Sequence, residues 1–353
     1  MSGEPPVGGP VQCAVIGSPI AHSLSPVLHR AAYAWLGLDW SYTRHEVTPA
    51  TLDAFLARCR GTWRGLSCTM PLKSAIVGLG ATDATVDALG VANTVLFDGA
   101  VTDRAARRVR NTDVTGLRRA IESVTSPRHA GVAAASPPIG GPAGADTPVA
   151  ALPSSPTGVA PERPSASWLA WSSIGGPVRV AVPVGAASPS PTGGAPERSS
   201  ASSPAWLRTA LVVGTGATAT SAVYALAGLG LARVDVAGRN EGALAALAER
   251  AAAWGVAVVG HGLDEPWPAV DLAVSTVPTD IGAGLAPSLL GAAGVIFDVL
   301  YNPWPTPLLA RAAVAGRPTV SGRDLLIHQA VGQIELMTGR TVPVEVLRVA
   351  LGG

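Results

Sequence analysis

A glycine loop between a strand and a helix limits most strongly what this chain can fold into. Residues 209–213 form an apolar run typical of a buried strand, and the loop Gly214-x-Gly216-x-x-Ala219 follows it directly. The next residues have the apolar spacing of a helix, and Arg233–Ala237 is a second strand-like run. A strand, a glycine loop, a helix and a strand within about thirty residues form the unit that binds dinucleotides. The sequence therefore predicts a Rossmann-type domain.

The same loop supplies the groups that hold a dinucleotide. Gly214 allows the sharp turn, and Gly216 lets the backbone approach a pyrophosphate beside the positive N-terminus of the helix. We therefore expect Gly214, Gly216 and Ala217 to bind the cofactor. Because tight turns also use glycine, the flanking strand and helix carry this prediction.

The end of the second strand indicates which cofactor binds. NAD-selective folds place Asp or Glu there, where it accepts a hydrogen bond from the ribose 2′-hydroxyl. This chain has Arg239 instead, and a guanidinium can pair with a 2′-phosphate. We predict NADP as the cofactor; the alternative is an arginine that only faces solvent.

Composition excludes several classes of partner. The chain has 353 residues, which favours two domains, and its 25 Lys+Arg nearly balance 24 Asp+Glu. This balance leaves no electrostatic footprint for nucleic acid or an anionic membrane. Residues 1–10 lack the basic start and apolar core of a signal peptide, so we expect a cytoplasmic protein. The three cysteines lack CxxC spacing, so we expect reduced thiols, with Cys13 and Cys68 buried, and no metal site.

Strand-like and helical segments alternate on both sides of a long middle segment. This alternation predicts an α/β fold with a mainly parallel first sheet. We expect residues 11–122 and 320–353 to form a substrate-binding domain, because the helical C-terminal segment should pack back on the first part. Residues 206–319 would form the NADP-binding domain, with a cleft between the two.

The middle segment, residues 123–205, has a different composition. Pro, Ser, Ala, Gly and Thr dominate it, and SPTGVAPERPSAS at 155–167 returns as SPTGGAPERSSAS at 190–202. Such a segment buries too little apolar area to offset the entropy of ordering it. We predict a disordered, duplicated insert; the alternative is a folded module in which Trp168 and Trp171 dock on a domain.

Lys73 and Asp113 are candidates for proton transfer. Lys73 follows a short apolar strand and a proline-containing turn, and Asp113 follows another strand-like run. Loops at one edge of a sheet can bring an amine and a carboxylate together as a proton-handling pair. The alternatives are a surface salt bridge and, for Asp113, an ordinary helix cap.

Ser23 and Ser25 alternate around Leu24 after the first strand. Both hydroxyls can face one side of an extended loop, and a helix N-terminus beside them would suit a carboxylate. The alternative is that Ser25 simply caps the helix that begins there.

These motifs, in this order, resemble the shikimate dehydrogenase family. The similar segments are GSPIAHSLSP at 17–26, CTMPLK at 68–73, GVANT at 90–94, NTD and Gly116 at 111–116, and YNP with TPL at 301–308. The resemblance covers nearly everything outside the insert. It implies that Lys73 is the catalytic lysine and Asp113 its partner.

The resemblance also implies how substrate would be held. Ser23 and Ser25 would bind its carboxylate, and Thr69 would contact it as well. Asn93 would contact a substrate hydroxyl, and Gln329 would reach the substrate from the C-terminal helix. Tyr301 would lie near the nicotinamide and the substrate.

The implied reaction is the NADPH-dependent, reversible reduction of 3-dehydroshikimate to shikimate, a step towards chorismate and the aromatic amino acids. A monomer or homodimer acting on this small molecule is expected. Alternatives are a quinate or aminoshikimate dehydrogenase of the same family, or a catalytically silent protein that binds shikimate or NADP.

The chain departs from the family pattern in the expected site. Ser67 stands where the family commonly has an asparagine that contacts substrate, so this contact would be lost or pass through water. Residues 277–280 differ near the nicotinamide, and Thr215 and Thr218 occupy positions in the glycine loop. These departures bear on the choice of substrate and the cofactor affinity more than on the reaction class.

Overall fold

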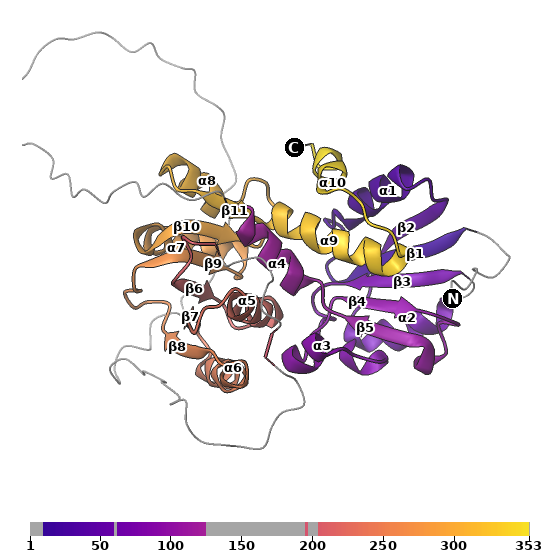
Figure 1. The fold of residues 1–353 in the computed structure, drawn as a ribbon, viewed down its shortest axis with the longest axis horizontal. Coiled ribbons are helices and arrows are strands. Elements are labelled where there is room, and N and C mark those ends of the chain that lie inside the picture. The colour runs from indigo at the N-terminus through magenta and orange to yellow at the C-terminus, as the bar shows by residue number, and fades with distance from the viewer. Residues whose placement is uncertain (1–9, 60–61, 125–194, 197–203, 353) are drawn as a thin grey trace, which may run out of the picture. The chain divides into compact units, whose positions relative to one another are not determined.

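In the part of the chain that the computed structural model describes, the strands form two separate sheets (Figure 1). The structure describes residues 10–59, 62–124, 195–196 and 204–352. The predicted insert therefore lies almost wholly outside the described residues, as do Trp168 and Trp171. None of the described helices is long and apolar enough to cross a membrane.

The first sheet has five strands in the order β2-β1-β3-β4-β5. They are β1 (Val11–Gly17), β2 (Trp40–Glu46), β3 (Trp63–Cys68), β4 (Thr94–Phe97) and β5 (Arg107–Arg110). Strand β1 pairs parallel with β2 and β3, whereas β4 pairs antiparallel with β3 and β5. Only β4 therefore runs against the other strands, which confirms the mainly parallel sheet.

The second sheet has six strands in the order β11-β10-β9-β6-β7-β8, and all of its pairs are parallel. They are β6 (Ala210–Val213), β7 (Arg233–Ala237), β8 (Ala257–His261), β9 (Val270–Ser275), β10 (Ala293–Asp298) and β11 (Thr319–Ser321). The strand order reverses between β6 and β9. In such sheets ligands bind outside the carboxyl ends of the strands at this switch point. The Rossmann-type prediction is confirmed, and the glycine loop lies at that point.

Ten α-helices cover the sheets in the described part of the chain (Figure 1). They are α1 (Ser25–Trp35), α2 (Leu52–Arg58), α3 (Ala84–Leu89), α4 (Asp113–Glu122), α5 (Ala217–Gly228), α6 (Glu241–Ala253), α7 (Thr279–Ala292), α8 (Pro307–Val314), α9 (Gly322–Thr338) and α10 (Val344–Ala350). Short 3₁₀ turns span Pro49–Thr51, Val77–Leu79 and Arg104–Ala106. The C-terminal segment is helical, as expected, and the expected break at Pro343 divides it into two helices: Gly339 ends α9 in a left-handed conformation, and Pro343 precedes α10.

Helix α9 returns the C-terminal segment to the first sheet. It packs on α1 and α4, and Leu28, Ile334 and Leu347 of one apolar cluster are fully buried. Burying a side chain of this size stabilises the fold by about 1.5–3 kcal/mol. Gly116 lets α9 approach α4 closely, since a Cβ there would lie 3.0 Å from the Gln329 backbone nitrogen. This packing carries Gln329 into the site.

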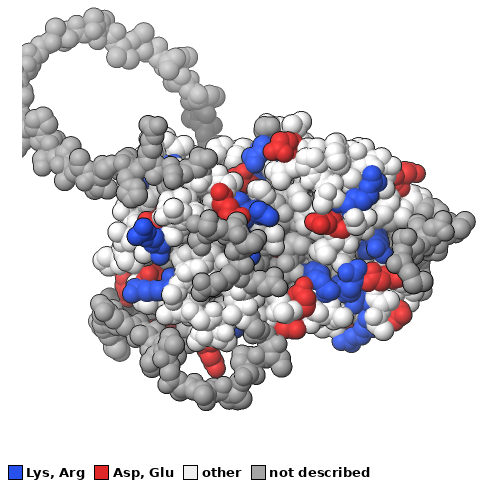
Figure 2. Space-filling model, viewed as in Figure 1, with Lys and Arg blue, Asp and Glu red and all other residues white. Residues whose placement is uncertain are grey.

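The surface shows acidic and basic side chains interspersed on the face seen in Figure 2. On the β4–β5 hairpin, Asp98 forms ion pairs with Arg64 and Arg108, and these charges lower the pKa of its carboxyl. The cysteines are buried free thiols, and burial raises the pKa of Cys13 and of Cys59 to about 11.

Candidate active site

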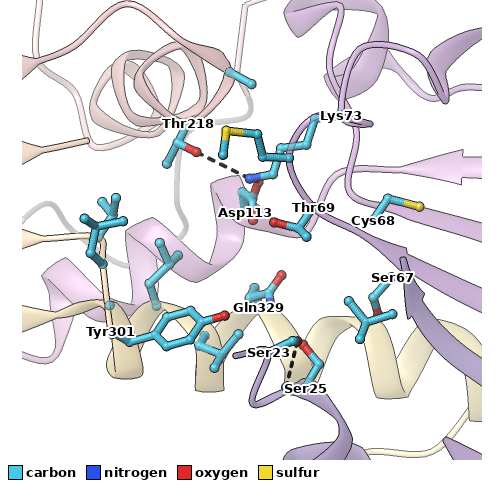
Figure 3. A pocket seen from close by; sticks show the side chains of 18 of the residues that line it. Ser23, Ser25, Ser67, Cys68, Thr69, Lys73, Asp113, Thr218, Tyr301 and Gln329 are labelled. Carbon is cyan, nitrogen blue, oxygen red and sulfur yellow. Dashed lines mark hydrogen bonds and ion pairs between the residues drawn. The ribbon is translucent and has the colours of Figure 1, made fainter. Parts of the chain in front are cut away.

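A cavity of about 510 Å³ is lined by loops that follow strands of both sheets. Its volume is in the range of small-molecule sites. Nine of the predicted site residues line it: Ser23, Ser25, Thr69, Lys73, Asp113, Gly216, Ala217, Tyr301 and Gln329. Figure 3 shows seven of them converging from separate elements: Ser23, Ser25, Thr69, Lys73, Asp113, Tyr301 and Gln329. Three other predicted residues, Asn93, Gly214 and Arg239, are not part of its lining.

Lys73 and Asp113 form a close ion pair in this cavity. The distance from Lys73 Nζ to Asp113 Oδ2 is 2.7 Å, and the two side chains are 17% and 7% exposed. Lys73 Nζ also lies 3.4 Å from Thr218 Oγ1 of the glycine loop (Figure 3). The pair is therefore largely shielded from water, unlike the surface salt bridge that the sequence left open.

Lys73 is the only lysine in the chain, since 24 of the 25 basic residues are arginines. Arginine stays protonated at all accessible pH values, whereas a lysine amine can give up and regain a proton. Position 73 is therefore the one place where a lysine stands in a chain that otherwise uses arginine. Leu72, fully buried beside it, anchors the turn that carries the amine.

Asp113 is the first residue of α4, but it does not cap that helix. Asn111 Oδ1 accepts hydrogen bonds from the backbone N–H groups of Asp113, at 2.9 Å, and of Val114, at 3.3 Å. Asn111 thus satisfies two of the free donors at the helix start. The Asp113 carboxylate stays available to Lys73, which removes the capping alternative.

Asn93 lies behind the cavity wall. It is 1% exposed, and its Nδ2 lies 2.9 Å from both Asp113 Oδ1 and Gln329 Oε1. In the structure its amide therefore orients two residues that line the cavity and does not itself line it.

Two serines form another part of the wall. Ser23 and Ser25 are buried and line the cavity. Helix α1 is preceded by Leu24 and has no side-chain cap, so the alternative that Ser25 caps it is wrong. Burial raises the pKa of the Tyr301 hydroxyl, and a hydrogen bond to Ser23 opposes this shift.

The loop between β1 and Ser23 is held by side chains of the edge strand β2. Glu46 accepts a hydrogen bond from Ser18 Oγ at 2.6 Å and a longer one from the Ile20 backbone N–H at 3.4 Å. Arg44 donates to the Ala21 carbonyl. These polar contacts fix the loop that leads into the two serines.

Ser67 belongs to a buried polar network with Tyr42, Gln333 and His29. Ser67 Oγ lies 2.7 Å from Tyr42 Oη and 2.7 Å from Gln333 Oε1, and both Ser67 and Gln333 line the cavity. His29 stacks on Tyr42 with ring centroids 4.0 Å apart. Burial lowers the pKa of His29 to about 3, so its ring is neutral. Gln333 was missed from the sequence, although its i+4 spacing from Gln329 places both amides on one helix face.

The glycine loop fits the diphosphate of a dinucleotide. Gly214 has a φ of +118°, and a Cβ there would collide with Thr276 Oγ1. Around Gly216 a Cβ would meet no heavy atom within 4 Å, which leaves room for a ligand against the backbone. Gly216 also precedes the first turn of α5, whose N–H groups have no side-chain cap.

Arg239 follows β7 and is exposed. Its guanidinium has no ion-pair partner among the residues that the structure describes. The next residue, Asn240, caps α6 by accepting from the Ala243 N–H at 2.9 Å, and this bond holds the turn. Asp235 lies within β7 and pairs with His261 at 2.7 Å, so it does not take the place of a ribose-binding acid. The turn therefore offers a cation and suits a 2′-phosphate.

Two family models match the chain. They are the shikimate dehydrogenase substrate binding domain, over residues 15–95, and the shikimate 5′-dehydrogenase C-terminal domain, over residues 322–351. The crystal structure of Mycobacterium tuberculosis shikimate dehydrogenase is 30% identical, covers 97% of this chain and 99% of that one, and has a TM-score of 0.68. Shikimate dehydrogenase (NADP(+)) of Halobacterium salinarum is 29% identical over 96% of this chain and 97% of its own length. The shikimate dehydrogenase (NADP(+)) of Natronomonas pharaonis is 28% identical over 96% of this chain and 97% of its own length.

Proposed function

Because the chain belongs to the shikimate dehydrogenase family, we propose that it catalyses the NADP-dependent, reversible reduction of 3-dehydroshikimate to shikimate, with Lys73 and Asp113 as its proton-handling pair. The observation that carries this proposal is the shielded contact between Lys73 and Asp113. It lies between the two serines and the glycine loop, in one cavity.

Lys73 supplies the proton in the direction of reduction. Its ammonium donates to the substrate oxygen as negative charge develops there, and it takes the proton back in the reverse direction. Asp113 accepts a hydrogen bond from the amine and holds it in place, while Asn93 holds Asp113 from behind. General acid–base catalysis of this kind contributes about 10²–10⁴-fold to the rate.

The substrate carboxylate binds at Ser23 and Ser25. Both hydroxyls can donate to it beside the N-terminus of α1, where a negative charge is favoured. Tyr301 closes this side, and Thr69 and Gln329 contact the ring. The carboxylate and the reacting oxygen are then fixed at separate points, and this sets the orientation of the ring.

Gly214, Gly216 and Ala217 hold the NADP diphosphate, and Arg239 pairs with the 2′-phosphate. When bound, NADPH supplies the hydride for the ketone carbon of the substrate. Residues 11–122 and 320–353 serve as the substrate-binding domain, and residues 206–319 serve as the NADP-binding domain. A cytoplasmic monomer or homodimer is the expected working form.

One assay tests the proposal directly. Purified protein is given shikimate with NADP or with NAD, and the reduced cofactor is followed by its absorbance; quinate and an amino analogue of shikimate are run in parallel. Fast reduction of NADP with shikimate is expected. Faster turnover of quinate would favour the alternative to which Ser67 points. Binding of shikimate or NADP without turnover would favour a silent binding protein.

A further inference from the structure

The wall of the cavity formed by Ser67 and Gln333 has unusual hydrogen-bonding properties. Both residues line the cavity, and they are 3% and 1% exposed. At this depth each polar atom needs a partner, so the donors and acceptors can be counted.

The orientation of the Gln333 amide is fixed by its neighbours. Its Nε2 lies 3.2 Å from the backbone carbonyl oxygen of Asn93 and 3.1 Å from Thr94 Oγ1. A carbonyl oxygen can only accept, so the nitrogen must face it. Both N–H groups of Gln333 are thereby used, and its Oε1 is turned toward Ser67 and also lies 3.4 Å from His29 Nε2.

As a consequence, the Ser67 hydroxyl must donate its hydrogen bond to Gln333. Its one proton goes to Gln333 Oε1, which can only accept, at 2.7 Å. Ser67 Oγ also accepts a hydrogen bond from the Tyr42 hydroxyl at 2.7 Å. A serine oxygen has two lone pairs, so Ser67 retains one acceptor site and no donor.

We propose that Ser67 and Gln333 form an acceptor-only wall that selects substrates by requiring a hydrogen-bond donor from a ring hydroxyl other than the reacting one. An asparagine at position 67 would instead offer two N–H donors from its amide. This inference rests on the proposed function, and it identifies Gln333 and Ser67 as specificity-determining residues. It favours a hydroxyl or an ammonium group at that ring carbon and disfavours a group that can only accept.

The test uses the wild-type protein and shikimate analogues. Each of the two non-reacting hydroxyls is replaced in turn by fluorine, which cannot donate, and by an amine, which can. At one carbon at least, fluorine should lower kcat/KM about 10-fold or more, because a buried partner is left unpaired, while the amine costs less than about 3-fold. Any other pattern overturns the acceptor-only wall.

Two variants locate the effect. In Ser67→Ala the fluorine penalty at the sensitive carbon should fall to within about 2-fold, because the Ser67 oxygen that fluorine leaves unpaired is gone, while Gln333 Oε1 keeps its contact with His29 Nε2 at 3.4 Å. Ser41→Ala on β2, whose hydroxyl contacts the Val11 carbonyl and lies outside the cavity, should keep the full penalty. A penalty that survives in Ser67→Ala overturns the assignment to Ser67. If the wild type oxidises no shikimate with either cofactor, the proposed function itself fails; if it is active but indifferent to the substitutions, only this inference fails.

Discussion

Asn111 Oδ1 accepts a hydrogen bond from the backbone N–H of Asp113 at 2.9 Å, while the Asp113 carboxylate pairs with Lys73, with Oδ2 2.7 Å from Nζ. An aspartate at the first position of a helix would often be taken for a capping group. Here the cap and the carboxylate are separate residues, two positions apart. The helix start therefore presents Asp113 to the cavity without losing its own stabilisation.

Replacing Asn111 by Ala should test this division of roles. Loss of the cap should lower the free energy of unfolding by about 0.5–2 kcal/mol and should also lower kcat, because Asp113 loses one of the contacts that position it. Urea unfolding and steady-state rates measure the two effects. The control is Asp83→Ala, which removes the cap of α3 and an ion pair to Arg110, and Asp83 does not line the cavity. It should lower stability while leaving kcat unchanged, and equal rates in the two variants would contradict the assignment.

Lys73→Arg should inactivate the enzyme nearly as strongly as Lys73→Ala. Arginine keeps the positive charge but does not release its proton, so a loss of about 10²-fold or more in kcat is expected for both. KM for shikimate should change much less. An active Lys73→Arg enzyme would show that charge alone is needed. Circular dichroism of each variant checks the fold.

The single lysine also permits a chemical test. Amine acetylation turns a titratable amine into a neutral amide, and among Lys and Arg side chains it can modify only Lys73, besides the chain terminus, because the other 24 basic residues are arginines. Modification should abolish turnover, and saturating shikimate with NADP should slow it, since the amine lies inside the cavity. Peptide mass mapping identifies the modified residue. Full activity after complete modification of Lys73 would refute its role.

Arg239→Ala should raise KM for NADP about 10- to 100-fold and leave the weaker use of NAD nearly unchanged. A charge-assisted hydrogen bond to a phosphate is worth about 1.5–3 kcal/mol, and NAD has no phosphate to lose. The matched control is Arg311→Ala, an exposed arginine of α8 that donates to the Ala283 carbonyl. Rates at varied NADP and NAD decide the outcome. Equal losses for both cofactors would point to a general disturbance of the turn.

His29 should make the protein less stable in acid. Its pKa in the fold is about 3, against 6.5 ordinarily, because burial disfavours the charged ring. Between these values the unfolded chain binds a proton that the folded chain does not. The free energy of unfolding should therefore fall as pH drops below 6.5, by about 1.4 kcal/mol per unit from this group.

His29→Gln provides the comparison for this pH dependence. Burial also lowers the pKa of His45 and of His328, and both histidines remain in the variant. The difference between the two unfolding curves from pH 4 to 6.5 therefore isolates His29. Parallel curves would mean that His29 does not titrate as its burial requires.

The sequence by itself determined the two sheets and the glycine loop, and it named the candidates for the chemically active groups. Apolar periodicity and turn residues are local properties, and they place strands and helices without knowledge of the rest of the chain. The spacing around Gly214 and the motif containing Lys73 are local in the same sense. They led to the reaction class before any contact was known.

Only the tertiary structure decided how these groups share their hydrogen bonds. Ser67 and Gln333 are separated by 266 positions, yet their side-chain oxygens lie 2.7 Å apart because α9 packs back on the first sheet. Asn93 faces Asp113 and Gln329, and Ser25 is free of the helix cap, for reasons that no local pattern contains. A hydroxyl has only one proton to donate, so the partner of a buried polar group depends on every neighbour that the fold brings to it.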